Sequence, residues 1–424
     1  MKLTPYWLDT SAPFDQIPSG PPEGAYDVAV VGGGITGSSA ALALARKGAR
    51  VALLEATTVG NAASGRNGGM CNNGFAQDYG SMVGTFGRDK ANALYKAFDS
   101  GVDLVEKLVR EEGIDCSFAR VGKLKLAAKP DHYDKLARSQ ALLAEGADPE
   151  TRMIAKSDLH AEVGTDRYHG GLLFPKSAQM HVGRYVRGLA RAAARRGADI
   201  YEQAPVTALR KRDGGHVVET PRGRITARQV LLASGISQEG PLGWIRRRIV
   251  PVGAFLIVTE PLPREQIARL MPAGRNVVDT RNLVVYWRLT PDNRMLFGGR
   301  ARFAGSNPQS DEKSGRILKA TMADVYPELA TARVEYCWAG LVDMTRDRLP
   351  RAGERDGIYY STGYSGHGTH MATLMGHVMA EVMDGQPELN PWKDFDWPAI
   401  PGYFGRPWFL PVLGAYYRMK DLVT

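Results

Sequence analysis

The sequence predicts an α/β fold in which a Rossmann-type, dinucleotide-binding domain is joined to a second domain. Two observations carry this prediction. Within residues 26–55, a strand, a glycine-rich turn, a helix, a second strand and an acidic residue follow one another, which is the order of a βαβ dinucleotide-binding unit. The chain also has 424 residues, more than one ordinary hydrophobic core contains, so two domains, interleaved or consecutive, are expected.

The first element is the apolar run at residues 26–31, which is typical of a buried parallel strand. Glycines follow it with the spacing Gly-x-Gly-x-x-Gly, at Gly32, Gly34 and Gly37. In such a motif the first glycine permits a tight turn and the second lets the backbone approach a pyrophosphate. The third lets helix and strand pack closely. We therefore expect these three glycines to bind a cofactor.

An alanine- and leucine-rich helix is expected over residues 35–47, ending at Gly48. Its amino end would direct the positive end of the helix dipole toward the phosphates. A second strand, at residues 51–54, leads to Glu55, eighteen residues after Gly37, where a carboxylate accepts hydrogen bonds from a ribose diol. A lone glycine motif also occurs in ordinary strand-to-helix turns, but here every part of the unit is present in order.

Composition and charge narrow the function classes. Hydrophobic residues make up 44% of the chain and charged residues 23%, which is typical of a globular protein and not of a disordered or fibrous one. The net charge is +9, but the arginines occur in short groups without interleaved aromatic residues, so no nucleic-acid partner is expected. Three scattered cysteines indicate neither a disulfide framework nor a metal site.

Targeting signals are not expected. No stretch reaches the roughly 18 uninterrupted apolar residues that a membrane helix needs, and residues 1–24 contain no apolar signal segment. The sequence therefore predicts no membrane span, and a cytoplasmic location is the simplest interpretation.

A glycine-rich stretch at residues 58–70, TVGNAASGRNGGM, resembles the flavin-contacting loop of the FAD-dependent D-amino-acid oxidase superfamily, which includes glycine oxidase and sarcosine oxidase. Small residues let a loop lie against a flat ring system, although the same composition is typical of a flexible surface loop. The resemblance implies FAD as cofactor and assigns the following residues to its binding: Ser64, Gly65, Arg66, Asn67 and Gly68.

Two later stretches extend this resemblance. Residues 197–211 are similar to the family's strand that brings the backbone near Val206 to the adenine. Residues 228–237 are similar to the element that closes the FAD site around Ala233 and Gly235. The resemblance therefore implies that these three positions also bind FAD.

A third stretch, at residues 359–385, resembles the turn and helix that cap the flavin in this family. Gly366 and Gly368 permit a tight entry into the helix, so that its first N–H groups face an electron-rich ligand. Between them, His367 is the first candidate for a catalytic residue at the flavin edge. A turn histidine bonded to the backbone is an equally weighted alternative.

Tyr286 and Arg288 are the other catalytic candidates. They share one face of an expected strand, and the resemblance implies that this face lies above the flavin. Arg288 would bind a substrate carboxylate, such as a γ-glutamyl head group, or else be an exposed strand arginine. Gly340 occupies the position of the cysteine that binds flavin covalently in sarcosine oxidase relatives, so dissociable FAD is expected.

Within the family, residues 282–300, 339–353 and 401–421 resemble the γ-glutamylputrescine oxidase branch. The resemblance implies oxidation of an amine C–N bond by hydride transfer to flavin N5, followed by imine hydrolysis and formation of hydrogen peroxide from molecular oxygen. An FAD-dependent dehydrogenase or oxidase of D-amino acids, sarcosine or pipecolate, with a quinone acceptor, is an open alternative. A third possibility is an RNA-modifying or purely binding flavoprotein, which the dispersed charge disfavours.

These resemblances imply an FAD-binding Rossmann-type domain interleaved with an α+β substrate domain built on a mostly antiparallel sheet. The expected ranges are 24–80, 160–240 and 336–388 for the FAD-binding domain, 81–159 and 241–335 for the substrate domain, and 389–424 for a carboxyl-terminal tail that covers the surface.

Overall fold

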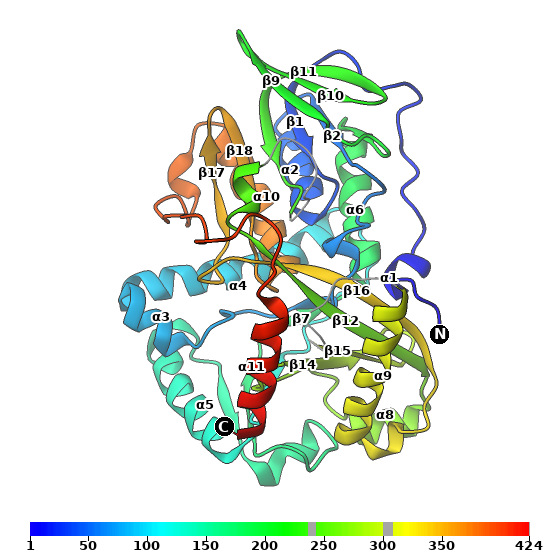
Figure 1. Cartoon of the computed structure of the whole chain (residues 1–424), viewed down its shortest axis with the longest axis vertical. Coiled ribbons are helices and arrows are strands. Elements are labelled where there is room, and N and C mark those ends of the chain that lie inside the picture. The colour runs from blue at the N-terminus through cyan, green and yellow to red at the C-terminus, as the bar shows by residue number, and fades with distance from the viewer. Residues whose placement is uncertain (236–242, 300–307, 424) are drawn as a thin grey trace.

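The computed structural model describes residues 1–235, 243–299 and 308–423 (Figure 1). One of its two eight-stranded sheets has the parallel order β18-β11-β1-β2-β8, with β17 antiparallel to β18 and the β9–β10 hairpin continuing from β11. Its strands are β1 Ala25–Val31, β2 Val51–Leu54, β8 Asp199–Tyr201, β9 Ala208–Arg212, β10 Gly215–Thr220, β11 Gly223–Leu232, β17 Arg351–Arg355 and β18 Ile358–Thr362.

The other sheet has the order β16-β12-β15-β14-β13-β4-β6-β5, and its strands run antiparallel except at the β13–β4 pair. Its strands are β4 Lys123–Leu126, β5 Arg152–Ile154, β6 Gly171–Phe174, β12 Val250–Pro261, β13 Asn276–Asp279, β14 Val285–Leu289, β15 Arg294–Gly299 and β16 Val334–Met344. A short ladder joins β3 Met70–Cys71 to β7 Ala178–Gln179.

Helices cover both sheets (Figure 1). Helices α2, α6 and α10 pack together beside the parallel sheet, α4 packs on α10, and α9 packs on β12, β15 and β16. The helix bounds are α1 Tyr6–Asp9, α2 Ile35–Arg46, α3 Tyr79–Phe86, α4 Arg88–Glu111, α5 Pro130–Leu142, α6 Val182–Arg195, α7 Gly243–Arg246, α8 Arg264–Leu270, α9 Pro308–Val325, α10 Gly368–Met383 and α11 Leu410–Val423.

This architecture confirms the predicted fold class, a Rossmann-type sheet combined with a mostly antiparallel sheet. The expected strand, helix and strand at the start of the chain are β1, α2 and β2. Strand β1 lies between β2 and β11 with both neighbours parallel, which explains why its residues form an uninterrupted apolar run. Residues 236 and 237, the end of the expected element at 228–237, lie outside the described residues.

Strands β6 and β16 do not belong to the sheet that the expected domain ranges imply. The ranges 160–240 and 336–388 were expected in the FAD-binding domain, but β6 pairs with β4 and β5, and β16 pairs with β12 along its length. Both strands therefore belong to the antiparallel sheet. Buried strands of either sheet have the same apolar composition, so the sequence did not indicate which partner each would take.

Helices α2 and α10 approach each other closely because a glycine lies between them. A Cβ atom on Gly376 would lie 2.6 Å from the carbonyl oxygen of Thr36 and 2.7 Å from the Cβ of Ser39. Ser39 also donates a hydrogen bond to the carbonyl of Thr373, at 2.7 Å. This contact brings the turn before α10 to the start of α2, where the Tyr364 and Thr36 hydroxyls lie 2.8 Å apart.

We expect Gly376→Ala to lower the free energy of unfolding by about 1–3 kcal/mol, because the added methyl group overlaps backbone that cannot move independently. Gly84→Ala is the matched control, since a Cβ there, on exposed α3, meets nothing within 4 Å. Alanine should raise stability at that position by roughly 0.5–1 kcal/mol. Urea unfolding followed by circular dichroism measures both, and equal effects would contradict the close contact.

Candidate active site

A cavity of about 2260 Å³ lies between the two sheets. Its wall includes the β1–α2 turn, the end of β2, the loop before β3, parts of β4, β14 and β16, the turn before α10, and α11. The wall contains most of the residues that the sequence analysis assigns to a cofactor. They are Gly32, Gly34, Glu55, Ser64, Arg66, Asn67, Gly68, Val206, Ala233, Gly235, Gly366 and Gly368.

The glycine turn has the close contacts that its motif predicts. Gly32 has φ +111°, and a Cβ on it would lie 2.7 Å from the carbonyl oxygen of Ala233. A Cβ on Gly37 would overlap the carbonyl oxygen of Gly32, so Gly37 lies behind the cavity wall and acts through packing. At the helix start, the Ile35 N–H donates to the Ser64 hydroxyl at 2.9 Å. The turn therefore presents the positive end of α2 to the cavity.

Glu55 lies at the end of β2 and faces the cavity. Its carboxylate accepts hydrogen bonds from the backbone N–H groups of Gly33, at 2.7 Å, and Thr57, at 2.9 Å. These bonds fix the side chain beside the glycine turn. A carboxylate has about four acceptor positions, so Glu55 retains capacity for a ligand hydroxyl.

The loop at residues 61–70 is shaped by its own polar side chains. The Asn67 amide donates to the carbonyls of Ala63 and Ser64, both at 3.1 Å, and its oxygen accepts from the Gly69 N–H at 2.8 Å. The Arg66 guanidinium donates to backbone carbonyls as well. The loop is therefore ordered by hydrogen bonds within itself and to Ala339, unlike the flexible surface loop that was the alternative interpretation. Gly65 is buried and not part of the cavity wall.

Arg288 does not have the surroundings of a substrate-binding residue, which corrects the expectation. Its side chain is 1% exposed and is not part of the cavity wall. It donates hydrogen bonds to the carbonyls of Gly68, at 2.8 Å, Met180, at 2.5 Å, and Leu289, at 3.3 Å. Strand alternation was correct in placing Arg288 on the same face as Tyr286, but at Arg288 that face meets the backbone of the loop.

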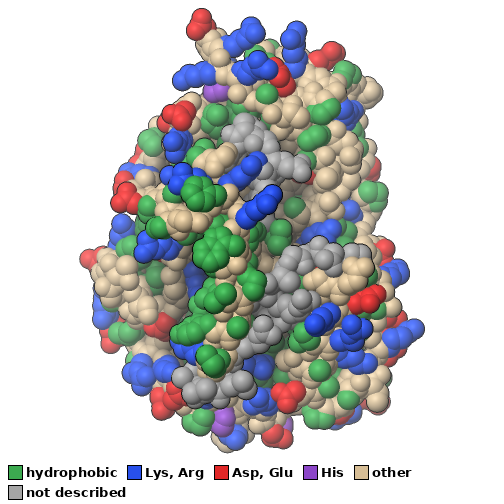
Figure 2. Space-filling view, viewed as in Figure 1, with side chains coloured by type: hydrophobic (Ala, Val, Ile, Leu, Met, Phe, Trp, Pro, Cys, Tyr) green, Lys and Arg blue, Asp and Glu red, His purple; other side chains and the backbone are tan. Residues whose placement is uncertain are grey.

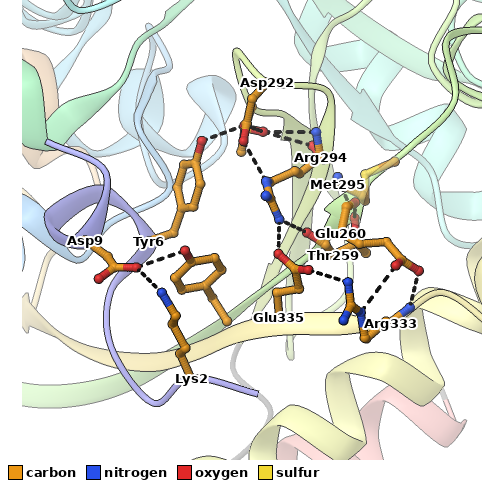
Figure 3. A network of polar contacts seen from close by, with 12 residues as sticks. Lys2, Tyr6, Asp9, Thr259, Glu260, Asp292, Arg294, Met295, Arg333 and Glu335 are labelled. Carbon is orange, nitrogen blue, oxygen red and sulfur yellow. Dashed lines mark hydrogen bonds and ion pairs between the residues drawn. The ribbon is translucent and has the colours of Figure 1, made fainter.

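The amino-terminal segment, which was not among the predicted site elements, also holds this loop. Trp7 is fully buried, its indole N–H donates to the Asn67 carbonyl at 2.7 Å, and the Arg288 guanidinium lies 4.9 Å from its ring centroid. A polar network fixes this segment on the antiparallel sheet (Figure 3). In that network Tyr6 donates to Asp292 at 2.6 Å, and Asp9 accepts from Lys2 and Tyr336.

Tyr286 and His367 both face the cavity, from β14 and from the turn before α10. The Tyr286 ring lies under the loop, since a Cβ on Gly68 would be 3.2 Å from it. Burial, with the nearby charges of Lys123 and Lys125, lowers the pKa of His367 to about 3. The lowered pKa favours the uncharged imidazole at pH 7, and its Nδ1 is buried without a hydrogen-bond partner among the described residues.

Two lysines of β4, the buried Lys123 and the half-buried Lys125, were not among the predicted site residues. Lys123 and Lys125 both face the cavity, while Leu124 and Leu126 between and after them are fully buried in the core. Lys123 donates to the Asn73 carbonyl at 2.6 Å. Burial, and then the charge of Lys125, lowers the pKa of Lys123 to about 7. The KLKL alternation was the available signal, but exposed strands show the same pattern.

The tail at residues 389–424 does more than cover the surface. Leu410, Tyr417 and Lys420 form part of the cavity wall, and the Asp421 carboxylate accepts from the backbone N–H groups of Asn282, at 2.8 Å, and Leu283. The outer side of the same tail is apolar and exposed in the space-filling view (Figure 2). The exposed side chains are Phe404, Trp408, Val412, Tyr416 and Met419.

Comparisons with known proteins agree with this geometry. The chain is 32% identical over 404 residues to the gamma-glutamylputrescine oxidoreductase of Escherichia coli, covering 93% of this chain and 92% of that protein. It is 33% identical over 368 residues to the probable oxidoreductase OrdL of Haemophilus influenzae, covering 85% and 84%. The crystal structure of glycine oxidase from Geobacillus kaustophilus has the same fold, with TM-score 0.68, 24% identity, and 90% and 99% coverage.

A Rossmann-type sheet whose glycine turn opens onto a large intersheet cavity is typical of an enzyme that binds a dinucleotide cofactor. A family model described as FAD dependent oxidoreductase matches residues 27–382. The chain therefore belongs to the DAO family of FAD-dependent oxidoreductases, and FAD is its cofactor. The resemblance to the D-amino-acid oxidase superfamily, and to its γ-glutamylputrescine oxidase branch, is confirmed.

Residues 1–235, 243–299 and 308–423 were also searched for membrane-crossing helices and for metal-binding groups. None of their helices combines the length and the apolar character that a membrane crossing requires. The same residues contain no group of three or more His, Cys, Asp or Glu side chains arranged to hold a metal ion.

We expect Arg288→Lys to weaken FAD binding at least about tenfold, because an ammonium cannot reproduce the planar guanidinium that donates to several carbonyls and stacks on an indole. Arg212→Lys is the control, since Arg212 lies at the exposed end of β9. Titration of each apoprotein with FAD gives the dissociation constants. An unchanged constant for Arg288→Lys would show that Arg288 does not position the loop.

The buried lysine Lys123 predicts a pH dependence of stability. Its pKa is about 7 in the folded protein, against 10.5 for an ordinary solvated lysine. Between these values the unfolded chain binds more protons, so the free energy of unfolding rises with pH. Replacing Lys123 by Met should remove up to about 1.4 kcal/mol of that rise per pH unit. Urea unfolding of the unsubstituted protein and of Lys123→Met at pH 7 and 9 measures how much the free energy of unfolding of each changes with pH.

The exposed residue Lys107 of α4 provides the control substitution, Lys107→Met. It should leave the pH dependence as it is in the unsubstituted protein. A parallel pH dependence for the Lys123→Met and unsubstituted proteins would mean that Lys123 titrates as a solvated lysine.

Proposed function

We propose that FAD binds in the intersheet cavity with its pyrophosphate at the start of α2. The residues present fit this group, because Gly34 has no side chain at the cavity wall and the first turn of α2 points its positive end there. Glu55 and Val206, beside the turn, are assigned to the adenosine half. Gly68, Tyr286 and His367 are assigned to the ring system.

The proposed reaction is oxidation of the C–N bond of an amine, with γ-glutamylputrescine as the leading substrate. The chemistry that bound FAD supplies is acceptance of a hydride from the carbon beside the amine nitrogen and return of two electrons to molecular oxygen, which gives hydrogen peroxide. The nitrogen lone pair forms the C=N bond of an imine as the hydride leaves. Water then hydrolyses the imine to an aldehyde and a released amine.

The protein residues contribute position and charge. The neutral His367 is assigned a hydrogen bond to the substrate amine, and Tyr286 is assigned to the wall that holds the reacting carbon in place. The first N–H groups of α10, next to Gly366 and Gly368, face a site where negative charge can be stabilised. The observation that carries the proposal is the full-length similarity to gamma-glutamylputrescine oxidoreductase, together with a cavity of suitable composition.

The expected result with purified, FAD-loaded protein is that anaerobic γ-glutamylputrescine bleaches the flavin absorbance, and that air restores it with one hydrogen peroxide per flavin. Restoration by a soluble quinone but not by air would identify a dehydrogenase. A flavin that stays oxidised with γ-glutamylputrescine, and is bleached by a D-amino acid, sarcosine or pipecolate, would replace the leading substrate by the alternative class.

A pair of histidine variants completes this test. His367→Ala should slow the bleaching by roughly 10²-fold or more, because the positioning of the amine is lost. His160→Ala should leave the rate unchanged, since His160 is exposed and pairs with Asp166 at 2.9 Å, on a different part of the chain. Equal rates for the two variants would show that His367 does not take part in the reaction.

A further inference from the structure

The ammonium groups of Lys123 and Lys125 lack the partners that buried charges ordinarily have. Lys123 donates one hydrogen bond, to the Asn73 carbonyl, and lies 3.8 Å from the ring centroid of Phe174. Within the described ranges, neither lysine forms an ion pair with a carboxylate. An ammonium has three donors, so Lys123 keeps two for a ligand.

The carboxylates of the cavity wall are, in contrast, already bound to donors. Asp279 pairs with Arg281. Asp343 accepts from the backbone N–H groups of Gly363, at 2.7 Å, and Tyr364, at 3.2 Å. These two acidic groups are therefore held by groups on their own side of the cavity. The charges of Asp99 and Asp148 raise the pKa of Lys123, and that of Asp78 raises the pKa of Lys125, but among the described residues none of these carboxylates forms an ion pair with either lysine.

Such an arrangement favours an anionic ligand. Burial lowers the pKa of both lysines, and for Lys123 the charge of Lys125 is the next cause. Two like charges at one wall repel each other. A carboxylate bound beside them attracts both ammonium groups and offsets that repulsion. Basic side chains at a concave wall also attract anions from solvent when they have no carboxylate partner.

The position of the pair indicates which ligand group it meets. Lys123, Lys125 and His367 line the same cavity, and the charges of both lysines contribute to the lowered pKa of His367. The pair therefore faces the part of the cavity to which the flavin ring and the reacting carbon are assigned. The pyrophosphate is assigned to the start of α2, which follows β1 of the parallel sheet. The anion beside Lys123 and Lys125 therefore belongs to the substrate and not to the cofactor.

We propose that Lys123 and Lys125 form a subsite that binds a carboxylate of the substrate, so that the enzyme selects amines that carry a carboxylate over uncharged or purely cationic amines. This inference rests on the proposed amine oxidation. It assigns to β4 the role that the sequence analysis gave to Arg288.

The test uses the FAD-loaded protein and measures glutarate binding by isothermal titration calorimetry, with the neutral diamide glutaramide as the matched probe. We expect glutarate to bind and glutaramide to bind at least tenfold more weakly. Lys125→Gln should weaken glutarate binding at least tenfold, and Lys107→Gln should leave it unchanged. Equal binding of the two probes, or equal glutarate binding by the Lys125→Gln and unsubstituted proteins, would overturn the subsite. The probe comparison needs no variant to fold.

A substrate pair separates this inference from the proposed function. γ-Glutamylputrescine is compared with N-(4-aminobutyl)-4-aminobutanamide, which lacks only the α-carboxylate. A KM at least tenfold higher for the analogue supports the subsite, and equal KM values overturn it. If neither compound reduces the flavin while glutarate binding still depends on Lys125, the subsite stands and the proposed substrate fails.

Discussion

A buried guanidinium holds together the parts of the molecule that form the cavity. Arg288 belongs to the antiparallel sheet, yet it donates to the carbonyls of Gly68 and Met180 and stacks on Trp7. Burial lowers its pKa to about 9, and across the described residues it forms no ion pair, so backbone carbonyls compensate its charge. Any movement of the loop away from β14 would leave this charge less well solvated.

The cavity follows from that constraint and from the glycine contacts. The loop at residues 61–70 is fixed from one side by Arg288 and Trp7, while Gly32, Gly37 and Gly376 let the backbones of β1, α2 and α10 come together on the other. The resulting cavity presents the starts of α2 and α10, a neutral histidine and two lysines. This combination suits an anionic cofactor and a polar substrate.

The sequence predicted the parts of the fold in which local pattern and global structure agree. The β1–α2–β2 unit and its three glycines were found because each has its own local signal. The alternation of side chains along a strand placed Tyr286 and Arg288 on one face. It did not predict that Arg288 would contact the Gly68 carbonyl instead of facing the cavity. Lys123 and Lys125 were missed because a strand with alternating lysines is more often exposed, and Lys123 is covered by Asn73 and Phe174, which are distant from it in the sequence.

A crystal structure of the FAD-loaded protein would show whether the loop held by Arg288 and Trp7 forms one wall of the cofactor site. We expect pyrophosphate oxygens within hydrogen-bonding distance of backbone N–H groups at the start of α2, the flavin ring against Gly68 and Tyr286, and the bonds from Arg288 and Trp7 intact. A flavin bound away from Gly34, or a loop released from Arg288 by the cofactor, would contradict this expectation.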